Sequence, residues 1–235
     1  APMMDCTDKH FRMIMRKISS EALLYTEMVV AKSLVYTNKK ESFLDFNNEE
    51  HPISIQFGGD DPSILKEAAR MAQDWGYDEI NFNVGCPSPR VCSGNFGASL
   101  MQDPLKVAKC IESLKNSCSL PVTIKHRIGV DDNDSFRNLN HFVRNIANAG
   151  ADRFTVHARK AILKGLNPKQ NRTIPPLKYD FVKKLKKLNP ELLIEINGGF
   201  KNIDESIEAL NDFDGVMIGR SVYKRPLRWS EIDQK

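Results

Sequence analysis

The feature that most constrains the fold of this chain is a regular alternation of short apolar runs with helical stretches. The apolar runs are rich in Val, Ile, Leu and Phe, and most of them lack polar alternation, which is typical of strands buried on both faces of a parallel sheet. Such an alternation predicts right-handed β-α-β units and an α/β fold. The predicted strands span residues 23–29, 53–57, 79–84, 122–126, 153–157, 192–196 and 215–218.

Helix signals separate these predicted strands. Residues 61–62 and 103–104 each place an Asp before a Pro, the order expected of a capping residue and the first helical position. An apolar stripe over residues 136–146 predicts a third helix, and residues 202–205 resemble a capping box that opens a fourth. A further helix is expected near residues 13–18.

The (β/α)8 TIM barrel is the closed architecture that best fits this alternation at 235 residues. A barrel needs an eighth strand, and residues 1–5 resemble the tail of one, so most of the first strand is expected to be absent. The residue or two upstream should then be extended and paired with the strand at 23–29. No linker or low-complexity tract divides the chain, and we expect residues 1–235 to form one domain.

Composition and motifs exclude several classes of protein. With 27% charged and 41% hydrophobic residues, the chain is not expected to be disordered. No apolar run approaches the ~18 residues of a membrane span, and the N-terminus lacks the pattern of a signal peptide. The five cysteines include no Cys-x-x-Cys pair, so neither a disulfide framework nor a metal site is expected, and a reducing cytoplasm fits best.

Glycines follow the last two predicted strands, where barrels of this kind commonly hold a phosphate. Gly198, Gly199 and Gly219 would let backbone N–H groups approach the anion, and Arg220 would add a charge-assisted contact. Each glycine alone is explained by a tight turn. Their combination on two adjacent strands, next to an arginine, favours phosphate binding.

Polar side chains also occupy the ends of the earlier strands. Lys125 could be a Schiff-base lysine, a phosphate clamp or a cation beside an electron-rich cofactor ring, and an ion pair with Glu27 is the structural alternative. Cys86 lies between Gly and Pro after a strand, and a thiol that is mostly protonated at neutral pH can donate a proton. His157 and Gln56 are further candidates, although each could simply satisfy groups in the core.

Eight motifs in this order together resemble the tRNA-dihydrouridine synthases. They lie at residues 2–5, 25–28, 56–59, 76–81, 83–88, 125–129, 156–159 and 197–199. The segment 161–176, with Leu-Asn-Pro-Lys-Gln-Asn-Arg at 166–172, is typical of the DusA-like branch of that family. The resemblance covers nearly all of the chain.

The resemblance implies a TIM barrel that binds FMN and uses NADPH to reduce a D-loop uridine of tRNA to 5,6-dihydrouridine. Hydride would pass from reduced FMN to C6, and Cys86 would donate the proton to C5. Asn83 would contact the target uracil, and Arg159, Lys169 and Arg172 would contact tRNA. The residues implied to bind FMN are Pro2, Met3, Met4, Gln56, Lys125, His157, Asn197, Gly198, Gly199, Gly219 and Arg220.

Two departures from the family pattern accompany this resemblance. Position 6 is Cys where the branch usually has Trp, and the C-terminal helical domain that helps the family to hold tRNA is expected to be missing. The net charge of +4 hides a strong asymmetry, because residues 159–187 carry +9 and the rest of the chain carries −5. That basic segment supports an RNA substrate. The alternatives are a flavin barrel acting on a free pyrimidine-like molecule and a non-catalytic tRNA-binding remnant; the first leaves the basic segment unexplained.

Overall fold

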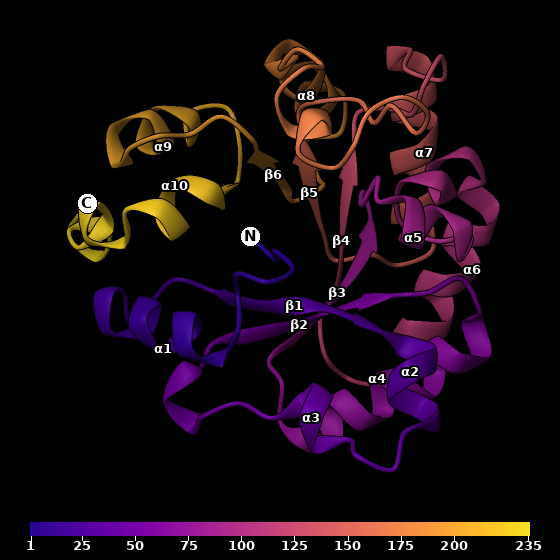
Figure 1. The fold of residues 1–235 in the computed structure, drawn as a ribbon. Helices are drawn as coiled ribbons and strands as arrows, with labels where there is room; N and C mark the ends of the chain where they lie inside the picture. Colours follow the sequence, from indigo (N-terminus) through magenta and orange to yellow (C-terminus); the bar gives the residue numbers. More distant parts are fainter.

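The computed structural model describes all of residues 1–235 and contains one curved, seven-stranded parallel sheet (Figure 1). Its strand order follows the chain, so each strand pairs with the next one in sequence. The α/β class and all seven predicted strands are confirmed, and together the strands form a half-barrel. The strands are β1 (Leu24–Val30), β2 (Ile53–Gly58), β3 (Glu79–Val84), β4 (Val122–Arg127), β5 (Arg153–His157), β6 (Ile194–Asn197) and β7 (Gly215–Met217).

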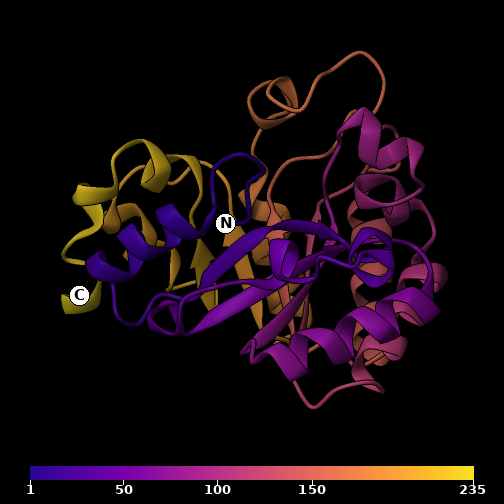
Figure 2. The same ribbon diagram turned by 60° about the horizontal axis from the view of Figure 1, so that its bottom comes forward.

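Helices cover the outer, convex face of this sheet, as two views 60° apart show (Figures 1 and 2). Among them α4, α6 and α7 pack side by side. The helices are α1 (Lys9–Ile18), α2 (Ala31–Tyr36), α3 (Glu41–Leu44), α4 (Pro62–Trp75), α5 (Pro89–Ser93), α6 (Pro104–Lys115), α7 (Phe136–Asn148), α8 (Tyr179–Leu188), α9 (Ile203–Ala209) and α10 (Arg220–Lys224). None of them is both long and apolar enough to cross a membrane.

The predicted capping residues begin the helices as expected. The side chains of Asp61 and Asp103 accept backbone N–H bonds at the first turns of α4 and α6, and Asn202 does the same for α9. The reciprocal bond of the expected capping box is shifted by one residue, because Glu205 accepts from the N–H of Lys201 at 2.8 Å. Gly76, at φ +96°, ends α4 in the left-handed conformation that glycine adopts without strain.

The strands separate an apolar outer layer from a polar interior. In β3, Ile80 and Phe82 belong to the large core cluster beneath the helices, whereas Glu79, Asn81 and Asn83 hydrogen-bond to residues of neighbouring strands. The expectation that most strands lack polar alternation is therefore wrong, because β2, β5 and β6 alternate in the same way as β3. The buried polar side chains of β3 are tolerated because they hydrogen-bond to polar groups of the neighbouring strands.

A partly buried ion cluster lies at the end of the sheet interior opposite the strands' carboxyl ends. Arg153 lies 2.5 Å from a Glu79 carboxylate oxygen and 2.8 Å from one of Glu195, and it also donates to the Tyr25 hydroxyl at 3.1 Å. Burial raises the pKa of Glu79, and the charge of Arg153 opposes that rise. The cluster therefore holds charged side chains in place at one end of the polar interior.

No strand precedes α1 in the structure, so the expected pairing beside β1 is not confirmed. The amino group of Ala1 instead donates to the carbonyl of Ile218 at 2.6 Å, just after β7. This contact places Ala1 beside the end of β7, and Figure 1 shows the N-terminus between β1 and α10.

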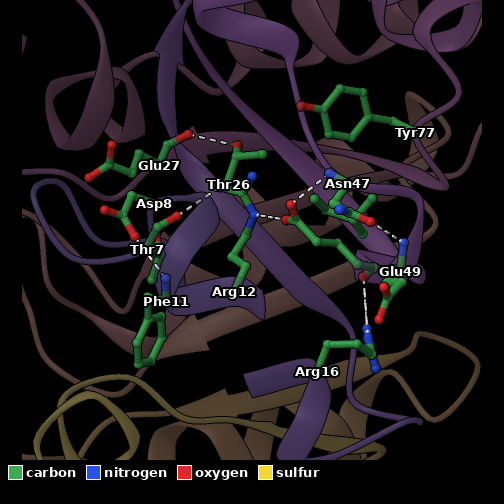
Figure 3. Close-up of polar contacts among 12 residues, drawn as sticks. Thr7, Asp8, Phe11, Arg12, Arg16, Thr26, Glu27, Asn47, Glu49 and Tyr77 are labelled. Carbon is green, nitrogen blue, oxygen red and sulfur yellow. Dashed lines mark hydrogen bonds and ion pairs between the residues drawn. The ribbon is translucent and has the colours of Figure 1, made fainter. Parts of the chain in front are cut away.

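Helix α1 is anchored to the segment before β2 by buried polar contacts (Figure 3). Arg12 pairs with Glu50, and both side chains are almost completely shielded from solvent. Arg12 also donates to the carbonyl of Thr7 at 2.9 Å, and Glu50 accepts from the N–H of Asn47 at 2.8 Å. Arg16 donates to five backbone carbonyls of the adjoining loops, including that of Pro52 at 3.0 Å. The N-terminal segment is thereby fixed beside the sheet.

Candidate active site

A cavity of about 1080 Å³ lies at the carboxyl ends of the strands, where barrel active sites are built. Fifteen of the sixteen predicted site residues line it, and the exception is Lys169, which is exposed on the segment after β5. The residues brought together are Pro2, Met3, Met4, Gln56, Asn83, Cys86, Lys125, His157, Arg159, Arg172, Asn197, Gly198, Gly199, Gly219 and Arg220.

The register of the parallel strands explains this convergence. Asn83 is opposite Lys125 in the pairing of β3 with β4. Two residues nearer the carboxyl ends, another row crosses β4, β5 and β6. Its successive partners are Arg127, His157 and Asn197. Since side chains at matched positions of a sheet share a face, the predicted residues stand in rows that face the cavity.

Lys125 reaches the cavity from the middle of β4. Its ammonium donates to Asn197 Oδ1 at 3.0 Å, and Asn197 in turn donates to the carbonyl of Met217 at 2.7 Å. The alternative ion pair with Glu27 is not formed, because Glu27 accepts from the N–H of Cys6 at 3.2 Å. Desolvation, followed by the nearby charge of Arg127, lowers the pKa of Lys125 to about 7. A bound anion or electron-rich ring would favour the charged lysine.

The shifted lysine predicts a pH-dependent stability of the protein without bound ligand. Between pH 7 and ~10 the unfolded chain holds the Lys125 proton more tightly than the folded chain, so the free energy of unfolding should rise with pH in that window. Lys125→Met should remove this rise, whereas Lys66→Met on the exposed surface of α4 should keep it. Urea unfolding at pH 7 and 9.5 measures the difference, and parallel pH profiles for all three proteins would contradict the assignment.

Cys86 lies on a turn that is fixed from two sides. Asn83 Oδ1 accepts from the N–H groups of Cys86 at 3.0 Å and Gly85 at 3.2 Å. On the other side the N–H of Ala98 donates to the carbonyl of Cys86 at 2.9 Å. Gly97 has φ +71°, and a Cβ there would lie 2.6 Å from that carbonyl oxygen. The turn therefore holds a half-buried cysteine at the cavity wall.

Two consecutive glycines after β6 line the far end of the cavity. Gly198 has φ +110° and Gly199 has φ +95°. A Cβ on Gly198 would lie 2.7 Å from Cδ2 of His157, and one on Gly199 would collide with the hydroxyl of Tyr179. Only glycine satisfies both the conformation and the space at these positions, which leaves backbone groups exposed to a ligand.

Replacing Gly198 should cost more than the strain of its backbone conformation alone. Gly198→Ala combines a positive φ with a collision against His157, whereas Gly165→Ala has φ +89° and open space around the new methyl group. We expect Gly165→Ala to lower the free energy of unfolding by ~1 kcal/mol and Gly198→Ala by roughly 2–3 kcal/mol. Urea unfolding measures the free energy of unfolding of both variants. Equal losses would show that the His157 ring moves aside without cost.

Four arginines gather around this cavity without a carboxylate partner. None of Arg127, Arg159, Arg172 and Arg220 forms an ion pair, and Nε of both Arg159 and Arg172 is buried without an acceptor. Burial, together with repulsion from neighbouring arginines, lowers the pKa of Arg127 to about 10 and also lowers that of Arg220. The cavity wall holds seven basic and two acidic residues. This excess of positive charge suits a phosphate-bearing ligand.

Arg127 lines the cavity but was not predicted as a site residue. It is 3% exposed and donates to the carbonyls of Gly85 at 2.9 Å and Asn171 at 3.1 Å, so it ties the Cys86 turn to the segment after β5. Its spacing of two residues from Lys125 on the same strand was the available signal. Burial, followed by the charges of Arg127 and Lys125, lowers the pKa of His157 well below its ordinary value, so this imidazole is neutral at pH 7.

No group of three or more His, Cys, Asp or Glu side chains is placed to hold a metal ion, and all five cysteines are free thiols. The groups near the strand ends of the cavity include the Cys86 thiol, the Lys125 ammonium, carboxamides and arginines. Such a set can bind an anionic cofactor, stabilise negative charge on a ring and donate a proton.

Comparison with known proteins agrees with this chemistry. The sequence model of the Dihydrouridine synthase (Dus) family matches residues 1–235. The chain is 53% identical over 234 residues to a tRNA-dihydrouridine(20/20a) synthase of Synechocystis, covering 100% of this chain and 70% of the relative. It is 49% identical over 235 residues to the enzyme of that name from Pseudomonas putida, with the same coverage. It is 48% identical over 236 residues to that of Vibrio cholerae, covering 100% of this chain and 72% of the relative.

Proposed function

Because this chain belongs to the dihydrouridine synthase family, we propose that it reduces a D-loop uridine of tRNA to 5,6-dihydrouridine with electrons from NADPH. The observation that carries the proposal is a single cavity in which Cys86 and Lys125 lie beside a cationic, glycine-lined end. A flavin-dependent reduction of a pyrimidine needs a bound flavin and a proton donor, and the cationic end and the thiol would meet these two needs.

The residues of the cavity fit FMN. The two positive-φ glycines and the guanidinium group of Arg220 suit its phosphate, since an anion there would offset the desolvation and the repulsion from Arg172 and Arg159 that lower the pKa of Arg220. Bound FMN would supply hydride to the pyrimidine ring. The side chains that we propose for the ring are those of Gln56, Lys125 and Asn197, with Lys125 offsetting negative charge that develops there. Pro2, Met3, Met4, His157, Gly219 and Arg220 complete the proposed flavin site.

Cys86 is the proposed proton donor to C5 of the uracil ring. Its backbone is held by Asn83, which lines the same cavity and is the proposed contact for the base. A donor on a turn fixed at both its N–H and its carbonyl keeps one position relative to the ring, which favours protonation at one carbon.

Arg159, Lys169 and Arg172 are proposed to bind the tRNA backbone. They belong to the segment of residues 159–187, which carries +9. A uridine must leave its stack to reach the cavity, and contacts between basic side chains and phosphates can offset that cost. The exposed Lys169, outside the cavity wall, suits a phosphate of the surrounding tRNA better than the target nucleotide. We place the reaction in the cytoplasm, on the grounds of its tRNA substrate and the free thiols.

The half-barrel is proposed to be part of an eight-stranded TIM barrel, with residues 1–235 as its catalytic domain. The open edges of β1 and β7 and the position of Ala1 beside Ile218 support an extended segment between those two strands. Such a segment would satisfy the edge groups of both strands.

An absorption spectrum tests the function most directly. The purified protein mixed with FMN should show a bound flavin band, NADPH should bleach it, and added unmodified tRNA should restore it as dihydrouridine forms. Restoration by free uridine but not by tRNA would instead support a small-molecule reductase. Binding of tRNA by a protein that takes up no flavin would support a non-catalytic role.

A further inference from the structure

A chain of hydrogen bonds between buried side chains runs from the ion cluster of Arg153 to the Cys86 turn. Its links are carried by three adjacent strands, and its two middle members, Thr123 and Asn81, are fully buried and do not line the cavity. In order, the members of this relay are Glu79, Thr123, Asn81, Gln56 and Asn83.

The contacts at the Glu79 end of the relay determine which groups donate and which accept. The Thr123 hydroxyl lies 2.9 Å from the Glu79 carboxylate, which Arg153 pairs, and 3.3 Å from the carbonyl of Ile80. Both neighbours can only accept, and a hydroxyl has one proton. The third neighbour, Asn81 Nδ2 at 2.9 Å, must therefore donate to Thr123, which turns the Asn81 oxygen toward Gln56.

The contacts at the Asn83 end of the relay independently require the same donors and acceptors. The N–H groups of Gly85 and Cys86 can only donate, so Asn83 must present its oxygen to them. Asn83 Nδ2 then donates to Gln56 Oε1 at 2.8 Å, and Gln56 Nε2 donates to Asn81 Oδ1 at 2.7 Å. No carboxamide of the relay can turn over without leaving a buried group unpaired.

We propose that Asn81 is a positioning residue that holds the carboxamide of Gln56 at the cavity, beside the carboxamide of Asn83. Both carboxamides already accept through their oxygens, and each retains one free N–H. The cavity therefore presents donors at these two positions, which suit carbonyl oxygens of a heterocyclic ring. For the ring of FMN this inference rests on the proposed function.

The closing experiment compares two variants of similar size at one position. Asn81→Leu removes the acceptor of Gln56, whereas Asn81→Asp keeps it, because either a carboxylic acid or a carboxylate can accept from Gln56 Nε2. We expect Asn81→Leu to raise the dissociation constant of FMN, measured by quenching of flavin fluorescence, about tenfold. Asn81→Asp should stay within about threefold of the parent protein. Equal affinity in all three proteins, or equal weakening in both variants, would overturn the proposal.

A second pair covers the case in which Asn81→Leu does not fold. Thr123→Val removes the hydroxyl that Asn81 donates to, and Thr123→Ser keeps it. FMN binding should weaken only in Thr123→Val, and equal binding by the two variants would contradict the relay.

A measurement without flavin distinguishes failure of the proposed function from failure of the relay. If the parent protein binds no FMN, the relay is still tested by NMR, through the exchange with D2O of the Gln56 side-chain amide hydrogen that is bonded to Asn81. Exchange should be slow in the parent and in Asn81→Asp and at least about tenfold faster in Asn81→Leu. Unchanged exchange would overturn the assignment of Asn81 whatever the enzyme reduces.

Discussion

Replacing Cys86 with alanine is expected to lower the rate of dihydrouridine formation by about 10²–10⁴-fold, the usual contribution of a positioned general acid. The cavity offers no second thiol, since Cys86 is the only cysteine among the residues that line it. The turn should survive the change, because it is held by backbone contacts to Asn83 and Ala98.

The measurement is single-turnover formation of dihydrouridine in tRNA with the flavin already reduced. Cys118→Ala is the matched control, because this half-buried thiol lies beyond α6 and outside the cavity wall. FMN affinity should be unchanged in both variants. A Cys86→Ala protein that turns over at the parent rate would remove the thiol as the proton donor.

The second large effect concerns stability. Glu50→Gln should lower the free energy of unfolding by ~3–5 kcal/mol, the usual cost of removing one partner of a buried ion pair. Glu50 is fully buried and Arg12 is 5% exposed, so the arginine would keep its charge without a counterion. The substitution preserves shape, so the loss reports the charge and its hydrogen bonds.

Glu49 supplies the control from the same short segment. It pairs with Lys17 on the surface, with more than half of each side chain exposed, and Glu49→Gln should cost less than ~1 kcal/mol. Urea unfolding of the three proteins at pH 7 separates the cases. Similar losses for the two variants would mean that water or another group compensates Arg12. Neither Arg12 nor Glu50 lines the large cavity, so the FMN affinity of the folded variant should be unaffected.

The sequence predicted the strands well because their signals are local. Apolar runs, capping residues and Pro at helix starts depend only on neighbours a few residues away. The site could then be predicted because barrel active sites lie at the carboxyl ends of the strands. The polar interior was harder to foresee. Asn81 lies in a correctly predicted strand, but its role depends on its partners on β2 and β4. Glu50 lies in an acidic stretch that looks exposed. Both depend on contacts with residues distant in sequence, which periodicity does not report.

The strands lie in the sheet in the same order as in the chain, and this order has a consequence for how the protein folds. Each pairing joins strands separated by one helical connection, such as the stretch from Arg127 to Arg153 between β4 and β5. The entropic cost of closing such loops grows only slowly with their length. The sheet can therefore lengthen strand by strand as the ribosome releases the polypeptide, with β1 and β2 able to pair while later segments are still being synthesised.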